Sequence, residues 1–323
     1  MIKWYSYTPI DTMFFKGSES MEMGQDHTST LIFPPFPETI TGAVRTVYLK
    51  QKNISFDDYN KGNISKNVVE EIGEAGKEAN FKVIGPFFKV DNKVYIPAPY
   101  SWFYEEENGV KCFEENNGYE SEIEIIKGKY LKSPLIKTKN SNVLWVDAKH
   151  IDNIKTLGGK WVRLEKDMFK KDRLIFNDVR TFYVKEPRTG IGIDYKNSRI
   201  VIEGHIYSFT HIRLRENVKL IFGINKDISI SDNGVMSLGG EKRFGFYQLE
   251  KDIEIFEGNS GLFCTLSAQK RNENLNKSII ATGKISYVGG WDFHKRFHKP
   301  MVGLYLAGSV FKEKIDDINC IEI

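Results

Sequence analysis

The stretch from Arg199 to Arg215, RIVIEGHIYSFTHIRLR, alternates apolar and polar residues over its whole length. Successive side chains of a β-strand point to opposite faces, so a period of two indicates a strand with one apolar and one polar face. The apolar face carries Ile200, Ile202, Ile206, Ile212 and Leu214. The polar face carries Arg199, Glu203, His205, Tyr207, His211, Arg213 and Arg215. We expect one long ribbon strand, or two strands with a bulge at Gly204.

Shorter segments on both sides of this stretch also have strand patterns. They are residues 2–8, 81–90, 93–97, 218–224, 244–249, 261–266 and 279–288, with Asp91-Asn92 as a hairpin turn between the second and the third. One helix is expected after Pro37, with Ile40, Ala43, Val44, Val47 and Tyr48 on its apolar stripe and Arg45 off it. Residues 147–157 allow a second, short helix. Few helices among many strands predict an α+β fold built on antiparallel sheets.

The length of 323 residues suits one large domain or two modest ones. Gly158-Gly159 supplies a stop, so we place a boundary there, between residues 1–158 and 159–323. Two insertions are expected in the first part. Residues 53–80 are polar and rich in Gly and Asn, which suits a loop or short helices, and residues 99–140 include a loop rich in glutamate.

Charge is unevenly distributed although the formal net charge is only +3. Residues 105–124 hold eight glutamates and one lysine, whereas residues 127–139 hold five lysines and no acid. Such runs are usually solvated faces, but basic runs that share one face would attract a phosphate backbone. Three widely spaced cysteines, Cys112, Cys264 and Cys320, indicate neither a disulfide framework nor a zinc site. With no signal-peptide or membrane-span pattern, we expect a soluble, cytoplasmic protein.

Common catalytic motifs are incomplete in this chain. Tyr195 stands where a dinucleotide-binding loop would place its third glycine, and Gly283-Lys284 is followed by Ile285 instead of Ser or Thr. His294 and His298 have the spacing of zinc ligands on a helix, but Gly289-Gly290 argues against a helix there. His27 beside Asp26 is more often a loop residue than a general base. None of these motifs identifies a catalytic residue, and we expect no cofactor and no metal.

Clusters of glycine, cation and aromatic residues are the stronger signal. Leu238–Phe246, LGGEKRFGF, combines glycines that allow close approach of a backbone with Lys242, Arg243 and Phe244. Trp291–Pro300, WDFHKRFHKP, interleaves aromatics and cations after a Gly-Gly pair. Both segments suit RNA, because cations neutralise phosphates and aromatic rings stack on bases. Each is also compatible with an ordinary turn or surface loop.

Several segments, taken in order, resemble one family. They are Phe14–Gly17; Phe33-Pro34-Pro35 with Thr39, Gly42, Ala43 and Arg45; Glu186–Asp194; Glu203-Gly204 with Ile206-Tyr207; Leu238–Phe246; Gly289–Asp292 with Lys299-Pro300; and Ala307–Val310. Together they look like the RAMP-superfamily subunit of the type III-B CRISPR effector, the Cmr complex. Leu306 and Gly303 depart from the proline and arginine of that family, so no phosphate contact is assigned there.

The resemblance implies two decorated ferredoxin-like, RRM-related modules, residues 1–158 and 159–323, with the glycine-rich loop in the second. It implies a non-catalytic protein of antiviral defence that holds the 5′ repeat-derived handle of the crRNA in a ribonucleoprotein. The implied partners are the crRNA, the large polymerase-like subunit and other RAMP subunits, and no membrane. The residues expected to contact RNA are Arg45, Arg188, Gly239, Gly240, Lys242, Arg243, Phe244, Gly245, Trp291, Lys295, Arg296 and Lys299.

Two alternatives remain open from the sequence. The first is a metal-independent RAMP endoribonuclease that processes CRISPR repeat RNA, with His27 or His294 as its acid or base. The second is a structural subunit that contacts only protein.

Overall fold

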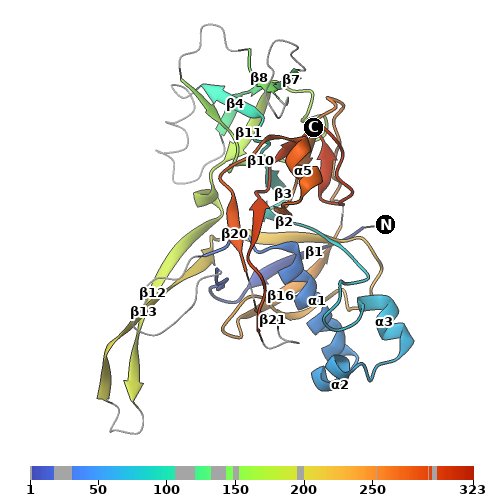
Figure 1. Cartoon of the computed structure of the whole chain (residues 1–323), viewed down its shortest axis with the longest axis vertical. Coiled ribbons are helices and arrows are strands. Elements are labelled where there is room, and N and C mark those ends of the chain that lie inside the picture. The colour runs from blue at the N-terminus through green and yellow to red at the C-terminus, as the bar shows by residue number, and fades with distance from the viewer. Residues whose placement is uncertain are drawn as a thin grey trace.

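The computed structural model describes residues 2–17, 31–105, 121–131, 143–147, 153–194, 200–251, 253–289, 291–292 and 297–323. Its centre is a nine-stranded sheet in which neighbouring strands are antiparallel (Figure 1). The strand order is β15 (Asn233–Ser237), β16 (Phe244–Glu250), β1 (Lys3–Pro9), β14 (Val218–Ile224), β2 (Val83–Val90), β3 (Lys93–Pro97), β10 (Trp161–Arg163), β11 (Arg173–Asn177) and β5 (Ser121–Glu124). The hairpin of β2 and β3 turns at Asp91-Asn92, as the sequence indicates.

One long helix, α1 (Pro37–Gln51), packs on this sheet. Pro37 is its first residue, where the missing N–H costs no hydrogen bond, and the predicted stripe from Ile40 to Tyr48 is buried. The core beneath it is aromatic: the fully buried side chains include Tyr5, Tyr7 and Tyr247 from β1 and β16. Burying rings of this size contributes much of the hydrophobic stabilisation of such a sheet.

Four strands and α1 follow the order of a ferredoxin-like unit. The chain runs through β1, α1, β2, β14 and β16, and the strands lie in the order β16-β1-β14-β2. Between β14 and β16, residues 225–243 form β15 and loops in place of a second helix. The fold is therefore α+β with mostly antiparallel sheets, as predicted.

The excursion between α1 and β2 folds into two short helices, α2 (Phe56–Lys61) and α3 (Lys66–Ile72). The Ser55 side chain caps α2 by accepting a hydrogen bond from Asp58 N, and Gly62 ends that helix in the left-handed conformation. Tyr59, Val68 and Ile72 are buried against the main core. The expected insertion at 53–80 is thus an ordered part of the fold.

Residues 200–214 of the alternating stretch lie in a two-stranded ribbon that projects from the body of the molecule (Figure 1). The ribbon consists of β12 (Tyr183–Asp194), which follows a short turn η1 (Val179–Thr181), and β13 (Ile200–Leu214). β13 is one long strand, and the register shifts between Ile191 and Ile193 of its partner. Backbone hydrogen bonds in both directions between Met13 and Ile212 attach the ribbon to the body.

Smaller sheets complete the molecule. The four-stranded sheet has the order β19 (Ile279–Ala281), β24 (Val310–Phe311), β17 (Phe263–Thr265) and β25 (Cys320–Glu322), and a three-stranded sheet has the order β18 (Gln269–Lys270), β23 (Val302–Tyr305) and β20 (Ser286–Val288). The remaining elements are α5 (Glu273–Ser278), β21 (Trp291–Asp292) with β22 (Phe297–His298), β6 (Ile126–Lys127) with β4 (Trp102–Glu105) and β9 (Ile154–Thr156), and β7 (Lys129–Leu131) with β8 (Val143–Trp145). The predicted strand 279–288 is divided into β19 and β20.

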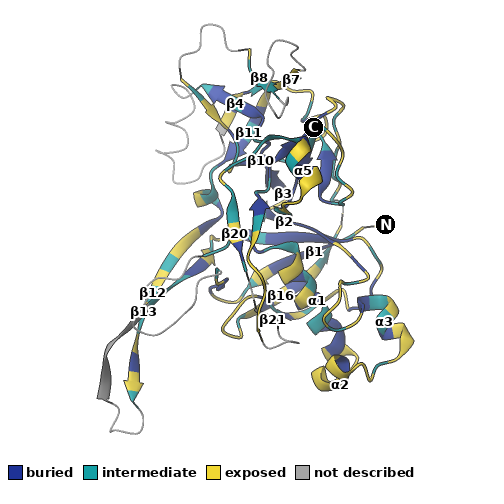
Figure 2. Cartoon of the chain, in the orientation of Figure 1, coloured by how far each residue is buried: buried dark blue, intermediate teal, exposed yellow. Residues whose placement is uncertain are grey.

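Near the middle of the chain the structure differs from the sequence expectations for residues 147–157 and for the boundary at residue 158. The short helix suggested for 147–157 is wrong at residues 154–156, which form β9 because they pair with β4, whereas residues 148–152 lie outside the described residues. Strands from both sides of residue 158 pair in the central sheet, so the predicted boundary does not coincide with a break between sheets. Figure 2 shows buried residues running through the centre and exposed ones on α2 and the ribbon.

Cys264 and Cys320 are buried free thiols, and Cys112 lies outside the described residues. In the part of the chain that the structure describes, no helix has the length and apolar character needed to cross a membrane.

Candidate nucleic-acid interface

The glycine-rich loop joins β15 to β16 in a tight turn. Leu238 N donates to Arg243 O at 3.1 Å, and Arg243 N donates to Gly240 O at 3.2 Å. Gly239 has φ +89°, and a Cβ on it would lie 2.5 Å from Phe14 O, which already accepts a hydrogen bond from Gly240 N at 2.8 Å. Gly239 is therefore required for packing of the loop on Phe14, and the exposed Lys242 is left at the tip.

Gly245 has a similar structural role one step further along the chain. A Cβ at this position would collide with Thr8 O on β1, so Gly245 allows close contact of the two strands. A Cβ on Gly239, Gly240 or Gly245 would thus point toward the protein, while Gly239 and Gly240 themselves are exposed, and their contact with RNA stays a prediction. They shape the surface on which Lys242 and Phe244 stand.

An apolar face of the sheet lies open beside this loop. Phe244, Phe246 and Val235 are 48%, 56% and 55% exposed, and Phe246 lies between Val235 and Thr8 in the strand register. On the opposite face Tyr247 is buried and receives a hydrogen bond from Gln51 of α1 at 2.8 Å. We call Ile10, Val235, Phe244 and Phe246 the open face.

Three arginines gather where the loop, the ribbon and the end of β1 meet. Arg188, Arg213 and Arg243 reach the Asp11 carboxylate at 3.5, 3.0 and 3.2 Å. Glu186 accepts hydrogen bonds from Arg213 at 2.7 Å and from Arg188 at 2.7 and 2.9 Å, and these bonds lower the pKa of Glu186. Arg243 also pairs with Glu241 at 3.2 Å. The arginines are thus largely compensated by carboxylates.

A buried histidine lies under this arginine cluster. His211 of β13 is 1% exposed, its Nδ1 lies 3.0 Å from Thr12 Oγ1, and its Nε2 lies 3.5 Å from Glu241. The Phe14 ring stacks on the imidazole with centroids 5.3 Å apart. Removal from solvent lowers the pKa of His211, so the ring is neutral near pH 7. His211 therefore links the ribbon to the glycine-rich loop.

Arg45 lies away from this cluster. Its guanidinium donates to Ile72 O at 2.8 Å and to Lys77 O at 3.1 Å, where it fastens the end of α3. The Ala307–Val310 motif is also engaged internally: Gly308 packs against Ala98 O, and the buried Ser309 donates to Leu306 O at 2.6 Å. Both segments carried the family resemblance, and both have structural contacts that account for their residues.

The remaining predicted positions are only partly placed. Lys299 is exposed after β22, and Trp291 lies on β21, of which the backbone alone is described. Lys295, Arg296, His27 and His294 lie outside the described residues. His298 is on a strand, not on a helix with zinc-ligand spacing, and no group of three or more metal-binding side chains occurs among the described residues.

The structure thus brings together Arg188 and the segment Gly239–Gly245, with Arg45 elsewhere. Sequence reasoning missed Asp11, Glu186, Arg213 and Phe246 as members of this region. Phe246 and Arg213 carried a detectable signal, because each lies on the polar or exposed side of an alternating strand. Asp11 and Glu186 carried none, since only the fold brings them to the arginines.

The chain is similar to CRISPR-associated proteins both in sequence and in fold. The model of the CRISPR-associated protein family Cas_Cmr3 matches residues 5–263. No curated protein matches the chain. Two solved structures of the type III-B Cmr-β complex are similar, one bound to cognate target RNA and AMPPnP and one bound to cognate target RNA. Each has a TM-score of 0.53 and 16% identity; they cover 95% and 96% of this chain and 85% and 86% of theirs. The resemblance seen in the sequence motifs is confirmed, and the chain belongs to the Cas_Cmr3 family of CRISPR-associated proteins.

Proposed function

We propose that this protein is a non-catalytic subunit of a type III-B CRISPR effector complex that binds the 5′ repeat-derived handle of the crRNA and bridges to the large subunit. Family membership and a fold shared with chains of Cmr-β complexes support the assignment to such an effector. Handle binding is inferred from the chemistry of the surface around the glycine-rich loop.

The observation that best supports the proposed RNA binding is that Lys242 is exposed next to the open face. Lys242 forms no ion pair with any described residue, so its charge is available to a phosphate, unlike those of Arg188 and Arg243. Phe244 and Phe246 stand two residues apart on one exposed face of β16. An open sheet with exposed aromatic rings beside a cation is a platform on which splayed bases stack.

The arginine cluster suits a positioning role in this proposal. Three arginines shared among Asp11, Glu186 and Glu241 fix the base of the ribbon and the loop before RNA arrives. Preorganisation of this kind lowers the entropy lost on binding. Lys242 and the aromatic rings then supply the contacts that RNA gains.

The handle interface predicts different effects of two substitutions on a handle oligonucleotide. In filter binding over a salt series, Lys242→Ala should reduce the salt slope by about 0.7, the value for one lost single-strand phosphate contact. Phe246→Ala should lower affinity by about tenfold and leave the slope unchanged, because stacking contributes about 1–3 kcal/mol per base. Lys61→Ala and Phe56→Ala, two exposed residues of α2, are matched controls. If both variants have the affinities and salt slopes of the controls, the proposed handle interface is wrong.

The competing nuclease is tested by incubating the protein with repeat RNA in EDTA. A non-catalytic subunit leaves the RNA intact. A unique cut that is lost in His27→Ala or His294→Ala would establish the endoribonuclease instead. If the chain contacts only protein, the handle should stay protected in the assembled effector after Lys242 is replaced. Bridging is a separate expectation, and it predicts that the isolated chain co-purifies with the large subunit.

A further inference from the structure

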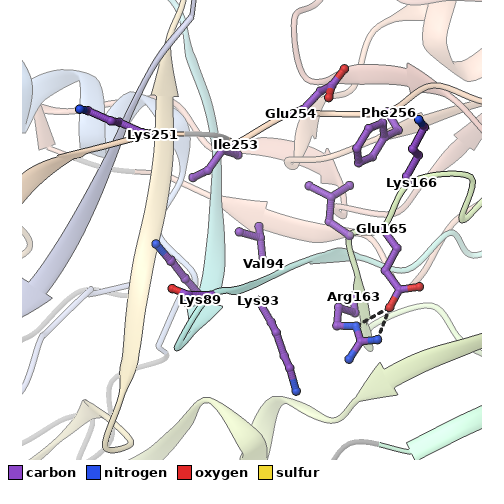
Figure 3. A pocket seen from close by; sticks show the side chains of 12 residues that line it. Lys89, Lys93, Val94, Arg163, Glu165, Lys166, Lys251, Ile253, Glu254 and Phe256 are labelled. Carbon is purple, nitrogen blue, oxygen red and sulfur yellow. Dashed lines mark hydrogen bonds and ion pairs between the residues drawn. The ribbon is translucent and has the colours of Figure 1, made fainter.

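A basic cleft lies at the opposite end of β16 from the glycine-rich loop. It has a volume of ≈ 610 Å³, and it is bounded by the β2–β3 hairpin, the residues after β10 and the segment that follows β16. Five of its side chains are basic, Lys89, Lys93, Arg163, Lys166 and Lys251, and two are acidic, Glu165 and Glu254. Figure 3 shows these cations around the apolar side chains of Val94, Ile253 and Phe256. We call it the lysine cleft.

The ion pairs of the cleft leave its positive charge concentrated on two walls. Glu165 is bound by Arg163 and Lys171, and Glu250 next to the cleft is bound by Lys89 at 2.5 Å. Burial opposes ionisation of Glu165 and Glu250, but these hydrogen bonds prevail and lower the pKa of both carboxyl groups. Lys166 and Lys251 are exposed, and neither forms an ion pair with a carboxylate of the described residues, although Lys166 is near enough to Asp167 to help Lys170 lower the pKa of that carboxyl group. They come from opposite sides of the cleft.

The shape of the cleft suits an extended ligand. A second cavity of ≈ 560 Å³ continues from it and shares Lys166, Glu254 and Phe256 as lining residues. The Phe256 ring is half-buried beside Lys166 (Figure 3). The second cavity adds Lys170, Asp167 and Glu257 to the lining, so the cations are concentrated in the first cavity. There they stand beside a partly exposed ring, an arrangement that matches a strand carrying both phosphates and bases.

The two lysines without an ion pair, Lys166 and Lys251, together with the Phe256 ring favour a strand of phosphates and bases as the partner. Lysine ammonium groups are compact point charges that tolerate a phosphate in several orientations, whereas arginine binds carboxylate and phosphate alike in bidentate pairs. Arg163 is the one arginine of the lining, and Glu165 already occupies it. We propose that the lysine cleft binds the phosphodiester backbone of single-stranded RNA, in the part of a guide strand beyond its handle. This inference rests on the proposed RNA binding of the chain but not on the contacts of Lys242.

The test compares Lys166→Glu/Lys251→Glu with Lys61→Glu/Lys66→Glu in the full chain. The control changes net charge equally and lies on α2 and α3. Filter binding uses a handle-only oligonucleotide and a guide RNA with handle and spacer. For the long guide, we expect the cleft variant to lower the salt slope by about 1.4 and the affinity by roughly tenfold or more at about 0.1 M salt. Handle-only RNA should bind both variants alike.

Three results would overturn the lysine cleft as an RNA site. One is a long-guide slope equal to that of the control, and another is an equal loss on handle-only RNA. The third is unchanged RNA binding with loss of a protein subunit from the assembled effector, which would assign the cleft to an acidic protein partner. The neutral pair Lys166→Gln/Lys251→Gln, with urea unfolding of every variant, separates lost contacts from lost folding. Failure of the handle interface instead shows only in the Lys242 and Phe246 variants on handle-only RNA.

Discussion

At the scale of single residues, Arg45 shows how a cation that looks available in the sequence becomes structural. It lies off the apolar stripe of α1, a position typical of a solvated arginine. The fold places α3 beside that side of the helix, and the guanidinium takes the carbonyl oxygens of Ile72 and Lys77. Burial lowers the pKa of Arg45, but the group remains a cation. Nothing local to the helix encodes this contact, because its partners lie 27 and 32 residues away.

Replacement of Arg45 therefore tests stability against RNA binding. We expect Arg45→Ala to lower the free energy of unfolding by about 1.5 kcal/mol in urea titrations, because hydrogen bonds from a charged donor are lost. Lys50→Ala, an exposed lysine of the same helix, should change it by a few tenths, roughly the size of a helix-dipole contact. Handle affinity of folded Arg45→Ala should equal that of the unsubstituted protein. Unchanged stability with weakened RNA binding would instead support the predicted phosphate contact of Arg45.

At the scale of elements, the segment Asp11–Phe15 couples the ribbon to the glycine-rich loop. Met13 pairs with Ile212 of β13, Phe14 O accepts from Gly240 N, and Thr12 bonds His211. The alternation of the ribbon strand predicted its two faces but placed His211 on the polar one. His211 is buried because the fold brings the segment Asp11–Phe15, which lies about 200 residues earlier in the sequence, over its side chain. The periodicity of a strand predicts which residues share a face, but it does not predict which other segment packs on that face.

The buried His211 predicts a pH dependence of stability. Unfolded histidine titrates near pH 6.5, and burial lowers the pKa of His211 in the folded state, so the unfolded chain binds more protons between the two values. Acidification below about pH 6.5 should therefore destabilise the protein. The groups that face the ring are Thr12, Glu241, Glu186, Arg188 and Arg243.

The measurement is the free energy of unfolding at about pH 7.5 and about pH 5.5, on either side of the unfolded histidine pKa. In His211→Asn, whose amide lies where Nδ1 does, the loss on acidification should be smaller than in the unsubstituted protein. An equal pH dependence in both proteins would mean that His211 has the same pKa in the folded and the unfolded state.

The sequence predicted most individual elements of the candidate site but not their assembly. Lys242, Phe244 and the glycines were found because they are contiguous, and they do lie on one loop and strand. The Asp11 carboxylate, which binds Arg188 and Arg243, was not identified from the sequence, because Asp11 lies 177 and 232 residues from these arginines in the chain. Charge compensation between distant segments depends on strand order, which local patterns do not encode.

At the scale of the whole molecule, the same limit appears in the domain division. Strand patterns identified β1, β2, β3, β14 and β16 nearly to their ends, but they did not say which pairs with which. β1 lies between β14 and β16, and β3 pairs with β10, so the sheet joins both sides of residue 158. A second link is Tyr100, which is packed against Gly158, Gly283 and Gly308. The two halves share one core that runs from Trp4 to Ile323.

Separate expression of residues 1–158 and 159–323 tests this arrangement directly. The first fragment would keep α1 and the β2–β3 hairpin but lose both partners of β1, which exposes Trp4, Tyr5 and Tyr7. Exposure of rings of this size removes several kcal/mol of stabilisation, roughly 1.5–3 for each large side chain, and that is a large fraction of the stability of a domain. We expect neither fragment alone to give a sigmoidal urea transition by near-ultraviolet circular dichroism. The intact chain should give one, and co-expressed fragments should co-purify as a folded pair. A cooperative transition in the isolated fragment 1–158 would show instead that the boundary at residue 158 separates two independent modules.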